Sequence, residues 1–280
     1  TGDLRGADKP SWLVPVGKSQ VILKEEGEGA ARRVILENGI VRAVINPGQG
    51  GRGENFVHKR SGKDLTLPLG ETKPGGLLSD HLWQQDYWKG DWLRAAYTVK
   101  VLEPSGNQVK VSLSAPGRLW TGLTIEKTIT LTKDSSVLAA DYTLSANDAV
   151  NNRCKPDFDF NQALAGPGKC FMPTESGVLE RPLSAESEDW VHDPTRGWMG
   201  FVAANGAGLG VTFDFQRIRA MRVAQQPGLT MEWLFRKVEA KPGMEIKTPV
   251  RLAAFVGLKE IAGVGEWAAA ELQVAAAKGE

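Results

Sequence analysis

The chain has 280 residues, of which 41% are hydrophobic and 24% charged, and its formal net charge is +1. A nearly neutral chain lacks the basic surface that a polyanion requires, so we expect no nucleic-acid partner. No apolar run approaches the roughly 18 residues of a membrane-spanning helix, so we expect no membrane span. The length and the apolar content suit one large domain, which we expect to cover residues 1–280.

Alternation of apolar and polar residues is the main secondary-structure signal. Residues 33–48, RVILENGIVRAVINPG, predict two strands around a hairpin turn at Asn38-Gly39. Residues 108–115 and 136–146 show the same period of two, which is typical of half-buried antiparallel strands. Residues 122–132 also alternate, but Lys127 is the one polar member of the apolar face. We therefore expect this strand to leave the core near its middle.

The second half of the chain continues the strand pattern. Further strands are predicted near 199–204, 209–215, 229–235 and 248–256. The best helix candidate is the Ala-rich segment 259–278 at the C-terminus. The prediction is an all-β fold, a large antiparallel two-sheet sandwich with at most a short C-terminal helix. It is too long for an immunoglobulin-like sandwich.

The stretch 75–92, GGLLSDHLWQQDYWKGDW, gathers aromatic rings beside carboxylates. Aromatic platforms with nearby acids are typical of sites that hold a sugar ring, and His81 could transfer protons near neutral pH. The alternative is a core strand in which His81 only satisfies hydrogen bonds. The candidate substrate-binding residues of this stretch are Asp80, Trp83, Asp86, Tyr87 and Trp88.

Two later stretches repeat this chemistry. Asp157 and Asp159 share one face of a predicted strand roughly 7 Å apart, and they suit paired acid/base work, a hard cation or merely an exposed polar face. Residues 188–201, EDWVHDPTRGWMGF, bring together Trp190, His192, Asp193 and Arg196, although DPTRG is also ordinary turn chemistry. Arg217 and Glu232 are further candidates for binding and catalysis, respectively.

Other motifs are less specific. Residues 48–53, GQGGRG, match the spacing of a dinucleotide-binding loop, but no helical pattern follows, so we interpret them as a Gly-rich turn between strands. Cys154 and Cys170 could form a disulfide or remain reduced, and two Cys with three scattered His cannot build a Cys-rich zinc site. We expect no cofactor and no metal.

Several passages resemble the galactose mutarotase-like superfamily, whose fold is a β-supersandwich. They are LENGIVRAVINPGQGGRGENFVHKRSGKDL, GGLLSDHLWQQ, TGLTIEKTITLTKDSSVLAADYTLSAND, GWMGFVAANGAGLGVTFD and KPGMEIKTPVRLAAFVGL. The likeness covers roughly residues 20–258 and is one of strand pattern more than of strict motif. Aldose epimerases of this superfamily use a His to protonate the ring oxygen and a Glu as base at the anomeric hydroxyl. Their Asn-His motif is absent, so the resemblance implies His81 as the nearest stand-in, His192 as a second and Glu232 as the base.

The resemblance leaves three functions open. The first is a mutarotase or epimerase-like enzyme that acts on a pyranose by acid/base catalysis. The second is a lyase-type enzyme on an oligosaccharide or polysaccharide, with Tyr87 or His81 as base and Arg196 or Arg217 facing a carboxylate. The third is a noncatalytic carbohydrate-binding module. The expected partner is a carbohydrate, and the oligomeric state is left open.

The expected location is periplasmic or secreted, with the cytoplasm as the alternative. The chain opens without an initiator Met, which is compatible with a removed leader. If the protein is exported, Cys154 and Cys170 are expected to be joined.

Overall fold

The computed structural model describes residues 20–69, 75–83, 92–150, 157–164, 166–182, 188–225, 229–237, 239–265 and 269–270. Strands dominate this part of the chain. The helical turns of the described residues are two short 3₁₀ turns, η1 (Gly29–Ala31) and η3 (Phe215–Arg217). None of the described residues forms a helix long and apolar enough to cross a membrane.

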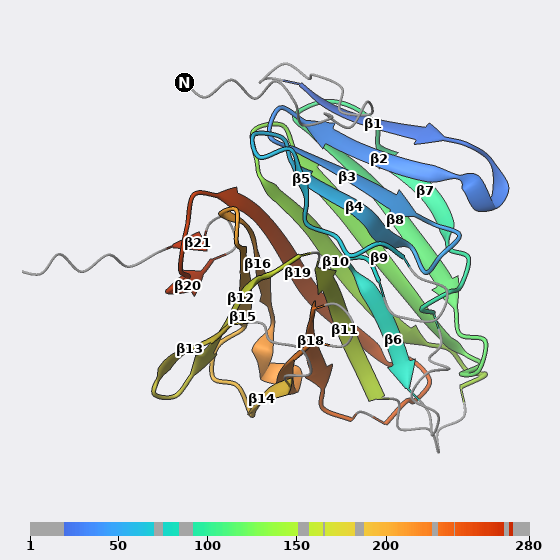
Figure 1. The fold of residues 1–280 in the computed structure, drawn as a ribbon. Helices are drawn as coiled ribbons and strands as arrows, with labels where there is room; N and C mark the ends of the chain where they lie inside the picture. The colour runs from blue at the N-terminus through green and yellow to red at the C-terminus, as the bar shows by residue number, and fades with distance from the viewer. Residues whose placement is uncertain are drawn as a thin grey trace, which may run out of the picture.

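The strands at the N-terminal end form a five-stranded antiparallel sheet. Its order is β1 (Val21–Glu26), β2 (Arg33–Asn38), β3 (Val41–Asn46), β4 (Arg52–His58) and β5 (Lys63–Asp64). Asn38 ends β2, and its side-chain oxygen accepts hydrogen bonds from the backbone amides of Ile40 and Val41, both 2.8 Å long. These bonds close the predicted Asn-Gly hairpin. In Figure 1 this sheet, in blue, lies across the green strands of a larger sheet.

The larger sheet has nine antiparallel strands. Its order is β13 (Gly177–Pro182), β12 (Gly168–Thr174), β15 (Trp198–Ala203), β16 (Ala207–Phe213), β19 (Glu245–Val256), β10 (Val137–Ala146), β9 (Leu123–Thr132), β8 (Gln108–Pro116) and β7 (Thr98–Glu103). Strands β8, β9 and β10 are the three segments whose alternation was clearest in the sequence.

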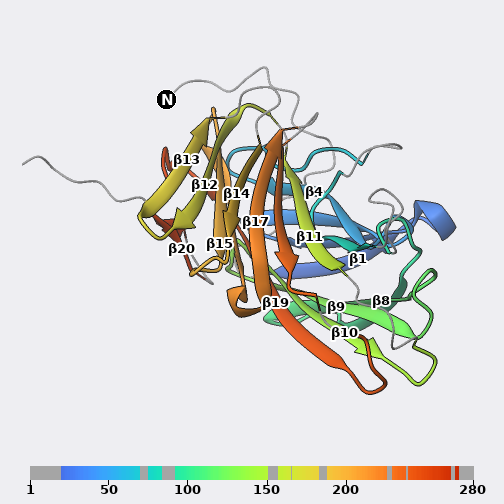
Figure 2. The ribbon, with the colours of Figure 1, turned by 90° about the horizontal axis from the view of Figure 1, so that it is seen from below.

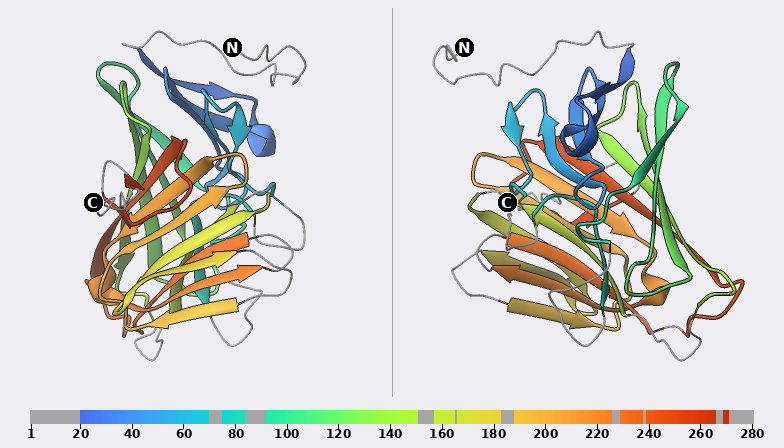
Figure 3. Two further views of the ribbon diagram at one scale, coloured as in Figure 1. Left: turned by 60° about the vertical axis from the view of Figure 1, so that its left-hand side comes forward. Right: turned by 90° about the vertical axis from the view of Figure 1, so that its right-hand side faces the viewer.

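A second five-stranded antiparallel sheet completes the layers. Its order is β14 (Glu188–His192), β17 (Ile218–Gln225), β18 (Leu229–Phe235), β11 (Asp157–Leu164) and β6 (Ser79–Trp83). Strands β6 and β14 are its edges. Figures 2 and 3 show this sheet from further sides, with the blue strands of the first five-stranded sheet at the opposite end of the molecule in Figure 3.

One buried cluster joins the three large sheets. It includes Val34 of β2, Leu131 of β9 and Trp233 of β18. Trp233 stacks on Phe213 of the nine-stranded sheet, with ring centroids 4.5 Å apart and planes 5° apart. Two sheets that each bury an apolar face against a third are a sandwich. The predicted all-β antiparallel sandwich is thus confirmed, whereas a single domain over residues 1–280 stays a prediction.

The C-terminal segment differs from its predicted helix. Within 259–278 the structure describes a two-stranded ladder of β20 (Gly263–Val264) and β21 (Ala269–Ala270), and residues 266–268 and 271–280 lie outside the described part. Ile261 and Val264 pack against the outer face of the nine-stranded sheet at Gly200 and Gly210. A Cβ on Gly200 would lie 2.3 Å from Ile261 Cδ1, so glycine leaves the space that this apolar side chain fills. Tertiary packing places residues 261–264 against this sheet rather than in a helix.

Cys170 of β12 is a free, buried thiol, and burial raises its pKa. It is therefore not joined to Cys154, which lies outside the described residues. The disulfide that export would favour is not formed in this structure.

Candidate functional site

A continuous row of paired positions crosses the second five-stranded sheet. The row runs from Trp190 through Arg222, Glu232 and Asn161 to Ser79. Residues paired across antiparallel strands share a face of the sheet. The core residues Met221 and Trp233 alternate with members of this row, so the row lies on the face opposite to the core. We call this face the polar face.

Glu232 lies at the centre of the polar face. Its carboxylate accepts a 2.9 Å hydrogen bond from Nη1 of Arg222 and another of 2.9 Å from Oγ1 of Thr230. Only 4% of Glu232 is exposed. Charge-assisted bonds from both sides fix the orientation of this buried carboxylate.

The β14 edge of the polar face is open to solvent. Trp190 is 40% exposed, and its ring lies parallel to that of His192, with centroids 5.8 Å apart and planes 1° apart. The guanidinium carbon of Arg222 lies 5.3 Å from the centre of the Trp190 ring. Arg222 also donates a 3.2 Å hydrogen bond to Glu188, whose carboxylate accepts from the Trp190 indole N–H. An exposed indole therefore stands beside a fixed array of donors and acceptors.

His81 lies on the opposite edge of the same face. It is paired with Asp159 of β11 in the row next to that of Glu232. Burial lowers the pKa of His81 from 6.5 to about 3, and the charge of Arg52 adds to this effect. His81 is therefore a neutral imidazole near pH 7, which suits hydrogen bonding and proton acceptance better than proton donation.

His81 and His192 lie at opposite ends of one row of paired positions. Leu234 of the central strand β18 is the middle of this row, and one further strand lies between it and each histidine. With strands spaced by about 4.8 Å, four spacings place their Cα atoms about 19 Å apart. One sugar ring cannot contact both. Glu232 is two strands and one row away from each histidine, at about 12 Å between Cα atoms, so it can act with either histidine.

The other predicted residues of this region are placed as follows. Asp157 and Trp83 occupy paired positions at the end of the face, one row beyond Asp159 and His81. Asp193 is exposed and forms a 2.7 Å ion pair with Arg236. Arg196 is exposed in the bend after β14, and Arg217 is exposed in η3. Asp86, Tyr87 and Trp88 lie outside the described residues.

Asp80 is on the core side of β6, not on the polar face. It is fully buried, and its Oδ2 lies 2.5 Å from Nζ of Lys127 and accepts a 2.9 Å hydrogen bond from Tyr97. Lys127 itself is fully buried in the middle of β9. The expectation that this strand leaves the core at Lys127 is therefore wrong, because the buried lysine meets a buried carboxylate.

Arg52 is a residue that the sequence did not single out. It begins β4 directly after the Gly-rich turn at 48–51 and is only 1% exposed. Its Nε and Nη1 donate to the carbonyls of Gln49 and Gly75 at 2.8 and 2.9 Å, while Nη2 has no hydrogen-bond partner among the described residues. Burial lowers the pKa of Arg52 to about 10, so the guanidinium keeps its charge near His81.

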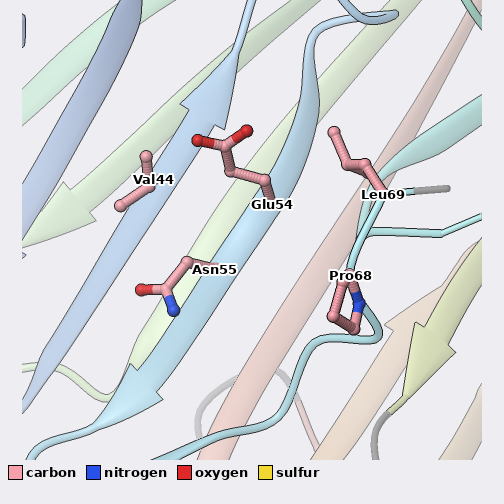
Figure 4. Close-up of a pocket in the computed structure, with 5 residues that line it drawn as sticks. All are labelled: Val44, Glu54, Asn55, Pro68 and Leu69. Carbon is pink, nitrogen blue, oxygen red and sulfur yellow. The ribbon is translucent and has the colours of Figure 1, made fainter. Parts of the chain in front are cut away.

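Two cavities lined by described residues lie away from the polar face. Figure 4 shows one of about 370 Å³, where Glu54 and Asn55 of β4 face Pro68 and Leu69. Its Glu54 carboxylate already binds Arg33 and Asn46, and Asn55 donates to Asp64. The other, of about 620 Å³, lies among His58, Arg60 and Asp134 near the ends of β4, β9 and β19. Among the described residues, no three acidic, His or Cys side chains gather closely enough to hold a metal ion.

Comparison with solved structures defines the fold class. The chain has the galactose mutarotase-like fold. A galactose mutarotase-like protein from Clostridium acetobutylicum matches with a TM-score of 0.59 and 9% identity over 85% of this chain and 99% of that one. No family model and no curated protein matches the sequence.

Two longer proteins match over only part of their length. A TPR-domain containing protein from Parabacteroides distasonis matches with a TM-score of 0.59 and 14% identity over 80% of this chain and 47% of that one. A 4-α-glucanotransferase from Thermococcus litoralis matches with a TM-score of 0.57 and 17% identity over 84% of this chain and 40% of that one. The chain thus spans less than half of these two proteins. At such identities the likeness concerns the fold alone.

Proposed function

We propose that the polar face binds a pyranose sugar and that the protein interconverts its anomers by acid/base catalysis. The observation that carries this proposal is the Glu232 carboxylate, which Arg222 and Thr230 hold at the centre of the face, in one row with the exposed Trp190. A sugar presents C–H faces that stack on an aromatic ring and hydroxyls that need fixed polar partners. Trp190 supplies the first, and Glu232 with Arg222 and Glu188 supplies the second.

In the proposed reaction Glu232 accepts the proton of the anomeric hydroxyl. The bond between the anomeric carbon and the ring oxygen then breaks, and an acid protonates the ring oxygen. His192 takes the role of the acid, because it is exposed and lies on the Trp190 side of Glu232. His81 acts as a neutral hydrogen-bonding group, because its low pKa leaves almost no imidazolium near pH 7. Closing the ring on the other side of the carbonyl gives the second anomer, and both protons return.

The test is anomer exchange measured by NMR with glucose and galactose. Glu232→Gln should lower the exchange rate by roughly 10²–10⁴-fold, the usual size of a general-base effect. Glu188→Gln is the comparison variant, because Glu188 accepts from the same Arg222 at the exposed edge, and it should weaken sugar binding without lowering the rate at saturating sugar. A Glu232→Gln protein that folds and retains the full rate would exclude Glu232 as the base.

A second candidate is a carbohydrate-binding domain without activity of its own. The observation in its favour is that the matched glucanotransferase is more than twice as long as the part this chain spans. A binding domain would retain sugar affinity with no turnover in the wild-type protein. Unsaturated product from an oligosaccharide would instead favour a lyase.

A further inference from the structure

Lys127 connects three sheets through one ammonium group. It lies on β9 of the nine-stranded sheet, and its Nζ donates to Gly50 O at 3.2 Å, to Leu78 O at 2.9 Å and to Asp80 Oδ2 at 2.5 Å. Gly50 belongs to the turn between β3 and β4 of the first five-stranded sheet, and Asp80 belongs to β6 of the second. A lysine ammonium has three N–H donors, so these three acceptors match its full capacity.

The surroundings of Lys127 are shaped for it. Tyr97 and Tyr142 place their rings 5.0 and 5.7 Å from Nζ, within the range of cation–π attraction. Gly51 has a φ of +57°, and a Cβ there would lie only 3.0 Å from Lys127 Cε. A side chain at position 51 would therefore crowd the lysine, which gives the Gly-rich turn a structural reason.

The start of β6 depends on this contact. Leu78, directly before the strand, has a φ of 54°, which is uncommon for a residue with a branched side chain. Leu78 is fully buried, and its carbonyl is one of the three acceptors of Lys127. Such a conformation persists only where its surroundings hold it, and the lysine is one group that does so.

Strand β6 is also an edge strand, paired with β11 alone. A shift of one residue in its register would turn every side chain to the other face. The alternation that puts Asp80 in the core puts His81 on the polar face. Whatever holds Asp80 in the core therefore also determines where His81 and position 83 lie.

We propose that Lys127 is a positioning residue that fixes the register of β6, and so presents His81 to the polar face. Its bonds to Leu78 and Asp80 fix the start of β6. Its bond to Gly50 connects the start of β6 to the first five-stranded sheet. The consequence for ligand binding rests on the proposed function, whereas the structural consequence does not.

The experiment is amide hydrogen exchange followed by NMR in Lys127→Met, with residues 229–235 of β18 as the internal reference. The exchange of residues 79–83 should accelerate roughly 100-fold more than that of β18, whose own acceleration reports the fall in global stability, as expected of a local opening added to the global one. Tyr97→Phe is the matched control, because it removes a hydrogen bond to the same Asp80 oxygen but leaves all three bonds of Lys127. It should lower the melting temperature without a selective effect on β6.

Equal acceleration of β6 and β18 in Lys127→Met would overturn the proposal, as would unchanged exchange in β6. If Lys127→Met does not fold, Asp80→Asn serves instead, since Lys127 then keeps its two carbonyl acceptors. It should show a smaller acceleration confined to β6, and an effect no more selective than that of Tyr97→Phe would again overturn the proposal.

The same variants separate this proposal from the proposed function. Both proposals are supported if Lys127→Met shows selectively faster exchange in β6 together with reduced sugar affinity, and if Tyr97→Phe keeps full sugar affinity. If the wild-type protein neither binds nor converts sugars, the proposed function fails, yet the exchange data still decide the role of Lys127.

Discussion

Arg222 donates hydrogen bonds to two carboxylates at once, to Glu232 at 2.9 Å and to Glu188 at 3.2 Å. Its side chain is 17% exposed, whereas that of Glu232 is 5% exposed. Arg222→Met should lower the free energy of unfolding by about 1–3 kcal/mol, because a buried carboxylate loses its charged partner. Urea unfolding measures this change.

The matched control is Arg236→Met, directly after the end of the neighbouring strand β18. Arg236 forms its ion pair with Asp193, and the side chains are 56% and 72% exposed. Exposed pairs contribute only about 0–1 kcal/mol, so this variant should stay close to the wild type. Equal losses of unfolding free energy in the two variants would mean that the burial of Glu232 does not strengthen its bond to Arg222.

The buried pair of Asp80 and Lys127 predicts strong non-additivity. Removing one partner leaves the other charge or dipole buried, so Lys127→Met or Asp80→Asn alone should cost about 3–5 kcal/mol. The double variant should cost clearly less than the sum of the two, because no buried charge remains in it. Additive losses in the double-mutant cycle would show that the two groups do not interact energetically.

His81 should make stability fall with acid. The pKa of His81 is about 3 in the folded chain, against 6.5 for an unperturbed histidine. Below pH 6.5 the unfolded chain therefore binds a proton at His81 that the folded chain does not bind. This contribution is complete above pH 6.5 and is lost as the pH falls toward 3, at up to about 1.4 kcal/mol per unit. Between pH 7.5 and pH 5 the wild type should therefore lose up to about 2 kcal/mol more than His81→Asn.

The comparison with His81→Asn isolates this effect from other titrating groups. Asp64 and Asp80 have pKa values raised by burial, and they act in both proteins alike. A His81→Asn protein with the pH dependence of the wild type would mean that His81 is protonated in the folded state.

Local patterns predicted much of the fold, because alternation and turn chemistry act between near neighbours in the chain. Strands β8, β9 and β10 and the hairpin at Asn38 follow from such patterns. The C-terminal segment does not, because Ile261 finds its place at Gly200, which lies far away in the sequence. An Ala-rich composition contains no information about that contact.

The candidate site shows the same limit. The pattern of residues 157–162 predicts a strand, which β11 is, but it cannot say that β17 joins β14 to β18 and brings Arg222 beside Glu232. The alternation of 122–132 predicts that the strand leaves the core at Lys127, because the partner Asp80 is 47 positions away and no local pattern points to it. Arg52 lies in a Gly-rich stretch whose pattern predicts only a turn, and its burial near His81 is visible only in the structure.

Two tryptophans on opposite sides of one sheet distinguish binding from folding. Trp233 is fully buried and stacks on Phe213, so Trp233→Ala should cost about 3–5 kcal/mol of stability. Trp190 is 40% exposed on the edge strand β14, so Trp190→Ala should cost less than about 1.5 kcal/mol of stability, mostly through its contacts with Arg222 and His192.

If the polar face binds a sugar, Trp190→Ala should nevertheless weaken binding by roughly 10-fold or more, since it removes the exposed stacking surface. Titration of glucose and galactose by NMR, together with urea unfolding, measures both effects. Sugar affinity that survives Trp190→Ala intact would place the binding surface elsewhere on the protein.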